Sequence, residues 1–199
     1  SVSDPDGDTT TVNYDWRLNG TSIAVLNLPM TAPFNNGSRN LTFDMSSYNH
    51  SAVLGDGTTT PTFNTSGIYG GSYAFDGLND FINISDSASL RPSQISIEFW
   101  INVAKFATSR IMQKGNLTSA WTISSDGFST NSTISFAIFN GSWESINATA
   151  NLTLNKWTHI AITYNASKNV SIYVNGTLNA SKLFTKNLIS QVGSTLTIG

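Results

Sequence analysis

The chain has 199 residues, a formal net charge of −2 and charged side chains at only 11% of its positions. A charge this small provides no basic surface for nucleic acid or for an anionic membrane. The length is sufficient for one sizeable domain with its own core plus a short extra segment. Cysteine is absent, so the core must stabilise the fold without disulfides.

Uncharged polar residues supply the solubility that the few charges do not. Ser and Thr together occupy 52 positions, and 15 of the 22 asparagines begin an Asn-x-Ser/Thr sequon. Shared turns explain some of these sites, such as Asn140-Gly141-Ser142, but not the whole excess. The excess predicts dense N-glycosylation and a location outside the cell. The sequon asparagines are Asn19, Asn36, Asn40, Asn49, Asn64, Asn83, Asn116, Asn131, Asn140, Asn147, Asn151, Asn165, Asn169, Asn175 and Asn179.

The combination of many sequons with no cysteine also bears on the source. A small secreted module of eukaryotes usually carries disulfides. We therefore expect a prokaryotic, in particular an archaeal, cell-surface protein. The sequence contains no signal peptide, long apolar span or lipidation motif, which predicts that the chain is a processed product or a piece of a longer protein.

Residues 1–25 form a separate β segment in this interpretation. Thr11–Leu18 alternates like a strand, Asn19-Gly20 is a hairpin turn, and Thr21–Leu26 is the expected return strand. The segment resembles the later strands of an immunoglobulin-like or PKD-like domain. The resemblance implies the end of a bead-like domain placed before the main one.

Two short alternating runs, Tyr73–Phe75 and Phe81–Ile84, flank a polar turn and predict a β-hairpin. Within the turn, Asp76, Asn79 and Asp80 lie within five residues. Oxygen ligands suit Ca²⁺, so these three side chains are a candidate calcium site. The geometry of a tight hairpin explains the same residues without a metal.

Longer alternating runs follow in Gln94–Val103, Trp157–Tyr164 and Val170–Val174. One row of each run is apolar and predicts the core side of a strand, while Glu98 and Trp100 lie on the opposite row. Strands at regular spacing, separated by turns and without a helical period, predict an all-β sandwich. The predicted core residues are Ile95, Ile97, Phe99, Ile101, Val103, Ile160, Ile162, Tyr164, Val170, Ile172 and Val174.

These motifs stand in a recognisable order: G-AFDG-NDFI-I-D, ISIEFWI, I-KG, W-HIA-TY, IYVNG and LTIG. Over residues 40–199 the order resembles the concanavalin A-like jelly-roll domains of the laminin G-like type. The resemblance implies a two-sheet jelly roll over residues 26–199, entered by a strand at Leu26–Met30. It also implies that Asp44–His50 is a turn in which Asp44 serves the loop. Such domains normally continue with one more strand after Ile198. We therefore expect an open edge that is completed either by a neighbouring copy or by a further part of the parent chain.

The fold hosts lectins, glycanases and structural modules, so activity must be argued from residues. Glycanases need two carboxyls flanking the scissile bond, and this fold supplies them as Glu-x-Asp-x-x-Glu on one strand. Here only Glu98 and Glu144 are present, so we expect no enzyme. Sugars stack on aromatic rings, which makes Trp100, Trp121 and Trp143 candidate ligand-binding residues. Packing within a sheet is the alternative role of these tryptophans.

The leading functional hypothesis is a non-catalytic, heavily N-glycosylated extracellular protein of structural or adhesive type. It would be a subunit of a cell-surface filament, sheath or layer, with other copies of itself or other surface proteins as partners. The alternative is a carbohydrate-binding, lectin-like module of a secreted or surface protein. Nucleic acid and membrane insertion are not expected for either. Ca²⁺ and N-linked glycans are the expected cofactors, and the alternative adds a glycan as a binding partner.

Overall fold

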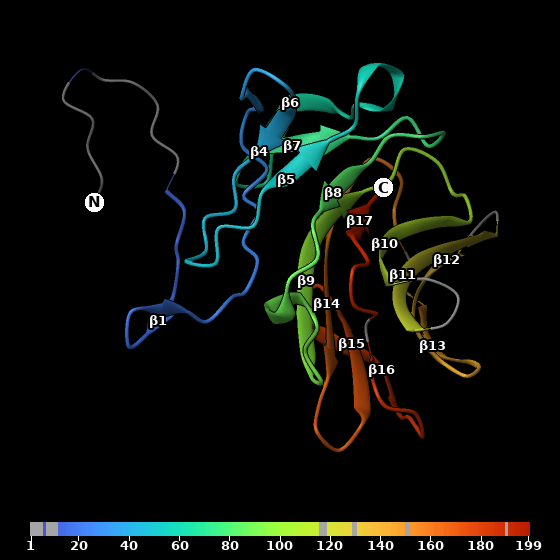
Figure 1. Cartoon of the computed structure of the whole chain (residues 1–199). Coiled ribbons are helices and arrows are strands. Elements are labelled where there is room, and N and C mark those ends of the chain that lie inside the picture. Colours follow the sequence, from blue (N-terminus) through green and yellow to red (C-terminus); the bar gives the residue numbers. More distant parts are fainter. Residues whose placement is uncertain (1–5, 7–11, 116–118, 129–130, 150–151, 190) are drawn as a thin grey trace. The chain divides into compact units, whose positions relative to one another are not determined.

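The computed structural model describes residue 6 and residues 12–115, 119–128, 131–149, 152–189 and 191–199 (Figure 1). Its described elements are strands, with two short 3₁₀ turns, η1 (Gly57–Thr59) and η2 (Ala88–Leu90). The predicted all-β class is therefore confirmed. The chain divides into two compact units, Ser1–Ile84 and Ser85–Gly199.

The first unit contains a small antiparallel sheet and two hairpins. The sheet strands pair in the order β3 (Phe34–Asn35), β4 (Asn40–Thr42), β5 (Ala52–Leu54) and β8 (Ile82–Ile84). The hairpins are β1 (Arg17–Leu18) with β2 (Thr21–Ser22), and β6 (Thr62–Gly67) with β7 (Gly70–Ala74). Ala52, Leu54, Ile82 and Ile84 are buried, so the central pair β5–β8 carries the core of this unit.

The hairpin predicted around the Asp76–Asp80 turn is wrong. Both of its runs contain strands, but β7 pairs with β6 and β8 pairs with β5. The turn therefore connects strands of two different sheets. The rings of Phe63 on β6 and Tyr73 on β7 meet at 5.6 Å, and such cross-strand aromatic contacts favour the observed partner. Alternation identified the strands without identifying their neighbours.

The N-terminal hairpin is confirmed at its turn but is shorter than predicted. Asn19 and Gly20 both have positive φ, 51° and 84°, as a two-residue hairpin turn requires. Its strands β1 and β2 have only two residues each. Residues 12–16 form no strand, and residues 7–11 lie outside the described residues. Leu26–Met30 is also not a strand, so the predicted entry strand is wrong. In this segment the backbone carbonyl of Asn27 accepts a hydrogen bond from the backbone N–H of Met45 at 2.8 Å.

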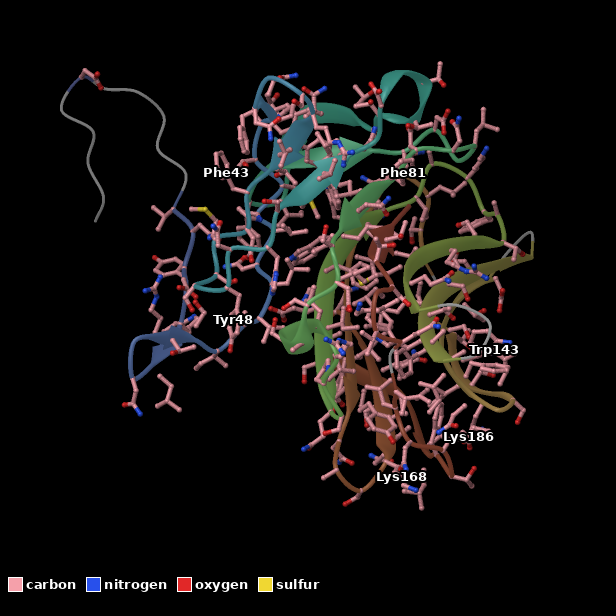
Figure 2. The ribbon with its side chains drawn as sticks, viewed as in Figure 1. Phe43, Tyr48, Phe81, Trp143, Lys168 and Lys186 are labelled. Carbon is pink, nitrogen blue, oxygen red and sulfur yellow. The ribbon has the colours of Figure 1, made fainter. Side chains whose placement is uncertain are left out.

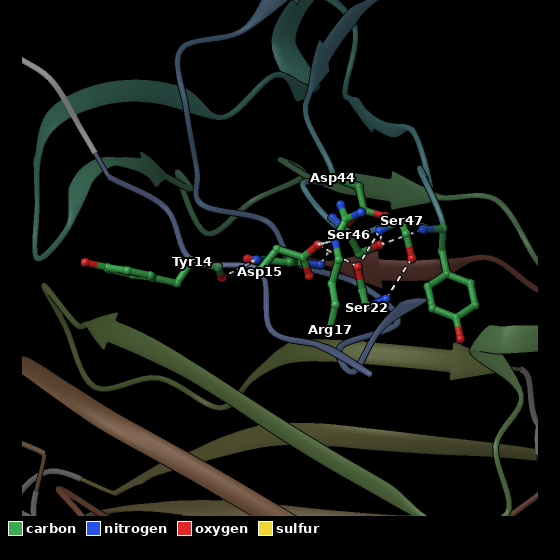
Figure 3. Close-up of polar contacts among 9 residues, drawn as sticks. Tyr14, Asp15, Arg17, Ser22, Asp44, Ser46 and Ser47 are labelled. Atoms are coloured by element: carbon green, nitrogen blue, oxygen red, sulfur yellow. Dashed lines mark hydrogen bonds and ion pairs between the residues drawn. The ribbon is translucent and has the colours of Figure 1, made fainter. Parts of the chain in front are cut away.

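Asp44 organises the loop that follows β4. Its carboxylate accepts hydrogen bonds from the backbone N–H groups of Asn27 and Ser46, each at 2.9 Å, and of His50 at 2.8 Å. It also accepts one from the Ser46 hydroxyl at 2.8 Å (Figure 3). A buried carboxylate satisfied in this way fixes a turn. The role predicted for Asp44 is confirmed.

A neighbouring network in the same view joins the short hairpin to this loop (Figure 3). The N–H of Ser22 donates to the Ser47 hydroxyl at 2.9 Å, and the N–H of Ser47 donates back to the Ser22 hydroxyl at 2.6 Å. The Ser22 hydroxyl in turn donates to Asp15 at 2.7 Å. That bond, followed by the one from Arg17, lowers the pKa of Asp15. These side chains connect the β1–β2 hairpin to the rest of its unit.

The second unit is built from two antiparallel sets of strands (Figure 1). The four-stranded sheet has the order β16 (Thr177–Leu183), β15 (Asn169–Val174), β14 (Trp157–Tyr164), β9 (Ile95–Asn102). The other set has the order β13 (Trp143–Thr149), β12 (Asn131–Asn140), β11 (Ser119–Phe128), β10 (Ser109–Gly115), β17 (Leu196–Ile198). This arrangement is a jelly-roll sandwich of the predicted class.

The core of this unit lies between the two sets of strands. Phe184 joins them, because its ring lies 6.5 Å from Phe136 of β12 and 6.5 Å from Tyr164 of β14. On β9, half-buried and exposed residues alternate, as predicted for a strand with one face toward the core. The buried apolar residues include Trp121, Ile123, Ile134, Phe136, Ile138, Ile160, Ile162, Tyr164, Val170 and Ile172, which confirms the predicted rows of β14 and β15.

One charged residue is fully buried in this core. Lys114 on β10 lies opposite Trp121 of β11. Its ammonium donates to Asp86 at 2.7 Å and to the Ser194 carbonyl at 2.6 Å. Asp86 also accepts the N–H of Gly193 at 2.6 Å. The hydrogen bond from Lys114 is the largest cause that lowers the pKa of Asp86, against the opposing effect of burial. The ion pair is therefore complete and hydrogen-bonded, as a buried charge requires.

Candidate functional site

The outward face of the four-stranded sheet carries a cluster of aromatic and polar side chains. In the β9–β14 ladder, Trp100 lies opposite His159, and Glu98 lies opposite Ala161. Tyr173 of β15 is opposite Ala161 on its other side. Because directly opposed residues share one face of a sheet, the side chains of Glu98, Trp100, His159 and Tyr173 gather away from the core. We call these four residues the Trp100 face.

The side chains of the Trp100 face contact one another. The indole of Trp100, 38% exposed, lies 5.1 Å from the His159 ring at an angle of 52°. His159 Nε2 lies 3.7 Å from a carboxylate oxygen of Glu98. The backbone of His159 exchanges two hydrogen bonds with Asn175, each at 2.9 Å, which hold the strand in place. A partly exposed indole with a carboxylate and an imidazole beside it can stack on a sugar ring and bind its hydroxyl groups.

The sequence placed Trp100 and His159 on the outward rows of their strands but did not bring them together. Their meeting depends on the register between β9 and β14, which are separated by more than fifty residues of chain. The alternation within each strand indicates that both side chains point away from the core. It does not indicate which residue of one strand lies opposite which residue of the other.

Trp143 occupies a different surface. It begins the edge strand β13, is 45% exposed, and makes an edge-to-face contact with Phe139 at 5.2 Å (Figure 2). Phe139 lies directly opposite it on β12. The turn between them contains the sequon asparagine Asn140. This pair is a second, smaller aromatic surface, and Phe139 is its member that the sequence did not single out.

Trp121 is not a ligand-binding residue, and the prediction for it is wrong. Its side chain is 2% exposed, and its ring lies 6.5 Å from Phe136. Trp121 and the buried Ile123 share one face of β11 because they are two residues apart. That face is the core side, so the indole packs inside the sandwich and no surface ligand can stack on it.

The two glutamates of the chain lie on different sheets. Glu98 is on the outward face of β9, whereas Glu144 is on the edge strand β13. The Glu144 carboxylate accepts the N–H and hydroxyl of Thr185 and the N–H of Lys186, at 3.0 to 3.2 Å. Burial acts to raise the pKa of Glu144, but these hydrogen bonds outweigh it, so the pKa lies below its ordinary value. Glu144 thus holds the segment after β16 and does not pair with Glu98.

At the candidate calcium loop, both carboxylates bind the backbone of the loop itself. Asp76 accepts the N–H groups of Leu78 at 2.8 Å and Asn79 at 3.3 Å, and Asp80 accepts the N–H of Asp76 at 2.8 Å. Such bonds shape a turn. In the described part of the chain, no group of three or more His, Cys, Asp or Glu side chains could hold a metal ion. Calcium binding by Asp76, Asn79 and Asp80 stays a prediction.

The exposure of twelve sequon asparagines is described, and none of the twelve is buried. Nine are exposed, and Asn83, Asn140 and Asn169 are half-buried. The side chains of Asn116, Asn131 and Asn151 lie outside the described residues. An asparagine side chain must be accessible before it can be glycosylated. Whether these asparagines carry glycans stays a prediction.

With the fold and these surfaces established, the class of protein is a concanavalin A-like jelly roll. The profile of the concanavalin A-like lectin/glucanases superfamily matches residues 75–199, which is more than half of the chain. The chain belongs to this superfamily. No curated protein sequence matches the chain. Among the described helical segments, none has the length and apolar character needed to cross a membrane.

Several solved structures share the fold. The binding domain of Paraclostridial Mosquitocidal Protein 1 is 18% identical with a TM-score of 0.64, over 83% of this chain and 42% of that one. The binding domain of botulinum neurotoxin serotype G is 21% identical with a TM-score of 0.62, over 86% and 43%. Domain 4 of AbnA, a GH43 extracellular arabinanase from Geobacillus stearothermophilus solved with arabinotriose, is 15% identical with a TM-score of 0.62, over 78% and 76%. The chain thus spans less than half of either toxin domain, and these identities establish the fold alone.

Proposed function

We propose that the chain is a non-catalytic carbohydrate-binding module and that the Trp100 face is its site. The observation that carries the proposal is the contact of Trp100 with His159, beside Glu98, on an outward sheet face. The indole offers an apolar surface to a sugar ring, and the two polar side chains offer partners to its hydroxyl groups. The likeness to an arabinanase domain solved with arabinotriose supports a sugar as the class of ligand, and the likeness to toxin binding domains supports a binding module.

The chemistry of the neighbouring side chains favours the Trp100 face over the Trp143 surface. Its polar groups come from two neighbouring strands and converge on the indole, whereas the ring next to Trp143 is the apolar Phe139. Asn140, in the turn beside Trp143, begins a sequon, and a glycan there would crowd that surface. The Trp100 face also has a sequon asparagine beside it, Asn175, whose side chain bonds to the backbone of His159, so sequons do not distinguish the two surfaces.

A glycan array probed with the protein and with the variants Trp100→Ala and Trp143→Ala tests the proposal. We expect the protein to bind one group of related glycans, Trp100→Ala to lose that binding, and Trp143→Ala to keep it. Both residues are surface tryptophans, so Trp143→Ala is a matched control. Absence of binding to any glycan, or loss of binding in Trp143→Ala alone, would contradict the proposal.

A structural or adhesive subunit of a cell-surface filament, sheath or layer is the second candidate. The observation in its favour is the density of sequons, whose described asparagines all reach the surface. An archaeal cell-surface location, strand exchange between copies and a preceding immunoglobulin-like or PKD-like domain belong to this proposal. Electron microscopy of the purified protein separates the candidates, since regular polymers favour the subunit and dispersed particles favour the binding module.

A further inference from the structure

A hollow lies at the end of the four-stranded sheet, where the turn Asn165–Lys168 joins β14 to β15. Its volume is about 220 Å³, which is roughly seven times the share of one water molecule in the liquid, ~30 Å³. Its lining includes Ser93, Gln94, Asn165, Lys168, Asn187 and Leu188. A hollow of this size holds a single sugar ring and is too small for an extended oligosaccharide.

Side chains at the floor of the hollow are buried or hydrogen-bonded, whereas several polar side chains at its rim can still bind a ligand. Tyr164 and Leu188 are buried; the Tyr164 hydroxyl donates to the Lys186 carbonyl at 2.9 Å and accepts the N–H of Leu188 at 3.3 Å. Lys168, labelled in Figure 2, has an ammonium that donates to the Thr185 carbonyl at 3.0 Å. By contrast, the side chains of Ser93, Gln94 and Asn187 make no hydrogen bond with the described residues. The hollow therefore offers an apolar floor below free hydroxyl and amide groups.

Asn165 lines this hollow and begins the sequon Asn165-Ala166-Ser167. Its side-chain oxygen accepts the N–H groups of Ser167 and Asn169, each at 3.0 Å, which fixes the orientation of the amide. Its Nδ2, the atom that carries an N-linked sugar, donates to no described residue. In Asn140, Asn169 and Asn179, Nδ2 is already a hydrogen-bond donor. Asn165 thus has an exposed side chain in a fixed orientation at the edge of the hollow, and its Nδ2 can receive a sugar.

We infer that Asn165 is N-glycosylated and that the first sugar of its glycan occupies the hollow. In the modification, Nδ2 attacks C1 of a sugar carried as a glycosyl phosphate. The N–C1 bond forms, the C1–O bond breaks, the phosphate leaves with the electron pair, and Nδ2 loses one proton. The attached ring then packs on Leu188, and its hydroxyl groups bond to Gln94 and Asn187. The inference rests on the proposed glycosylation of the chain and is independent of sugar binding at the Trp100 face.

The glycan at Asn165 should stabilise the fold, because it connects the β14–β15 turn to the segment at 187–188. Asn64 is a matched control. It begins an exposed sequon on β6 whose side-chain oxygen also accepts the N–H two residues on, at 2.8 Å, but it does not line the hollow. A glycan at Asn64 should therefore leave the melting temperature unchanged.

The test compares protein from a host that glycosylates Asn-x-Ser/Thr sequons with protein from a host that does not. Glycopeptide mass spectrometry should find Asn165 occupied. Ser167→Ala removes the Asn165 sequon but keeps the Asn165 side chain, and it should lower the melting temperature only in the glycosylated protein. Ser66→Ala, the same change at the Asn64 sequon, should alter it in neither. Asn187→Ala should abolish the glycan-dependent part of the gain. An unmodified Asn165 beside an occupied Asn64 would overturn this inference alone. Equal effects of the two sequon variants, Ser167→Ala and Ser66→Ala, would overturn it as well. If no sequon is modified, the glycosylation proposal fails as well.

Discussion

The buried ion pair of Lys114 and Asp86 allows the sharpest prediction about stability. Lys114→Met keeps most of the buried alkyl chain and removes only the ammonium. Removing one partner of a buried pair costs about 3–5 kcal/mol. Asp86 would keep the Gly193 N–H at 2.6 Å and the Arg91 guanidinium at 3.4 Å, and its side chain is 12% exposed. We therefore expect the lower limit, about 3 kcal/mol, for Lys114→Met.

The reciprocal variant should be more damaging. Asp86→Asn leaves the fully buried Lys114 ammonium without a carboxylate. Its remaining acceptors are neutral, namely the Ser194 carbonyl at 2.6 Å and the amide oxygen of the substituted side chain. We expect a loss near the upper limit, about 5 kcal/mol. Urea denaturation of both single variants and the double variant gives the coupling energy, which should exceed ~2 kcal/mol. A Lys114→Met variant as stable as the wild type would refute the reasoning.

The pH dependence provides a second readout of the same pair. The pKa of Asp86 is lowered in the folded state, first by the hydrogen bond from Lys114 and against the opposing effect of burial. A carboxyl of this kind stabilises the fold above its unfolded pKa of about 3.9, and the stabilisation is lost as the pH falls through the folded pKa. The wild type should therefore lose stability below about pH 4, and Lys114→Met should show a smaller loss in the same range.

Three further predictions concern other carboxylates. Asp44→Ala should lower the free energy of unfolding by about 3 kcal/mol, measured in urea, because it leaves several N–H groups without their acceptor; a change below ~0.5 kcal/mol would contradict the role given to Asp44. Glu144→Gln should destabilise the protein by about 1–2 kcal/mol at pH 7. Since the folded pKa of Glu144 is lowered, the difference should shrink as the pH falls below about 4, and a pH-independent difference would argue against it. For calcium at Asp76 and Asp80, a lower melting temperature in EDTA supports the site, and an unchanged one rejects it.

Sequence patterns predicted what depends on neighbours along one strand. Ile160 and Ile162 alternate with polar residues over a long run, so the core face of β14 was evident, and both are buried. The same rule contained the answer for Trp121, since it lies two residues from Ile123 and must share its face. Residue type alone suggests a sugar-stacking role for Trp121, whereas its position in the alternation of the strand indicates that it faces the core.

Patterns failed where the answer depends on distant residues. Tyr73 and Ile82 belong to strands whose partners, β6 and β5, are selected by packing and not by the turn between them. Lys114 is similar, because Asp86 is 28 residues away and Ser194 is 80 residues away. No local signal shows that a lysine in a strand points inward to a carboxylate. The contact of Trp100 with His159 is hidden for the same reason, since register is set by the whole sandwich.

The most direct test of the central claim is calorimetric titration of the glycan selected by the array into the wild type, Trp100→Ala and Trp143→Ala. Loss of an aromatic contact costs about 0.5–1.5 kcal/mol beyond the buried area, and the lost apolar area adds to that cost. Kd should therefore rise by a factor of about ten for Trp100→Ala. Trp143→Ala should bind as the wild type does. Equal affinities for the wild type and Trp100→Ala would contradict the assignment of the Trp100 face as the sugar-binding site.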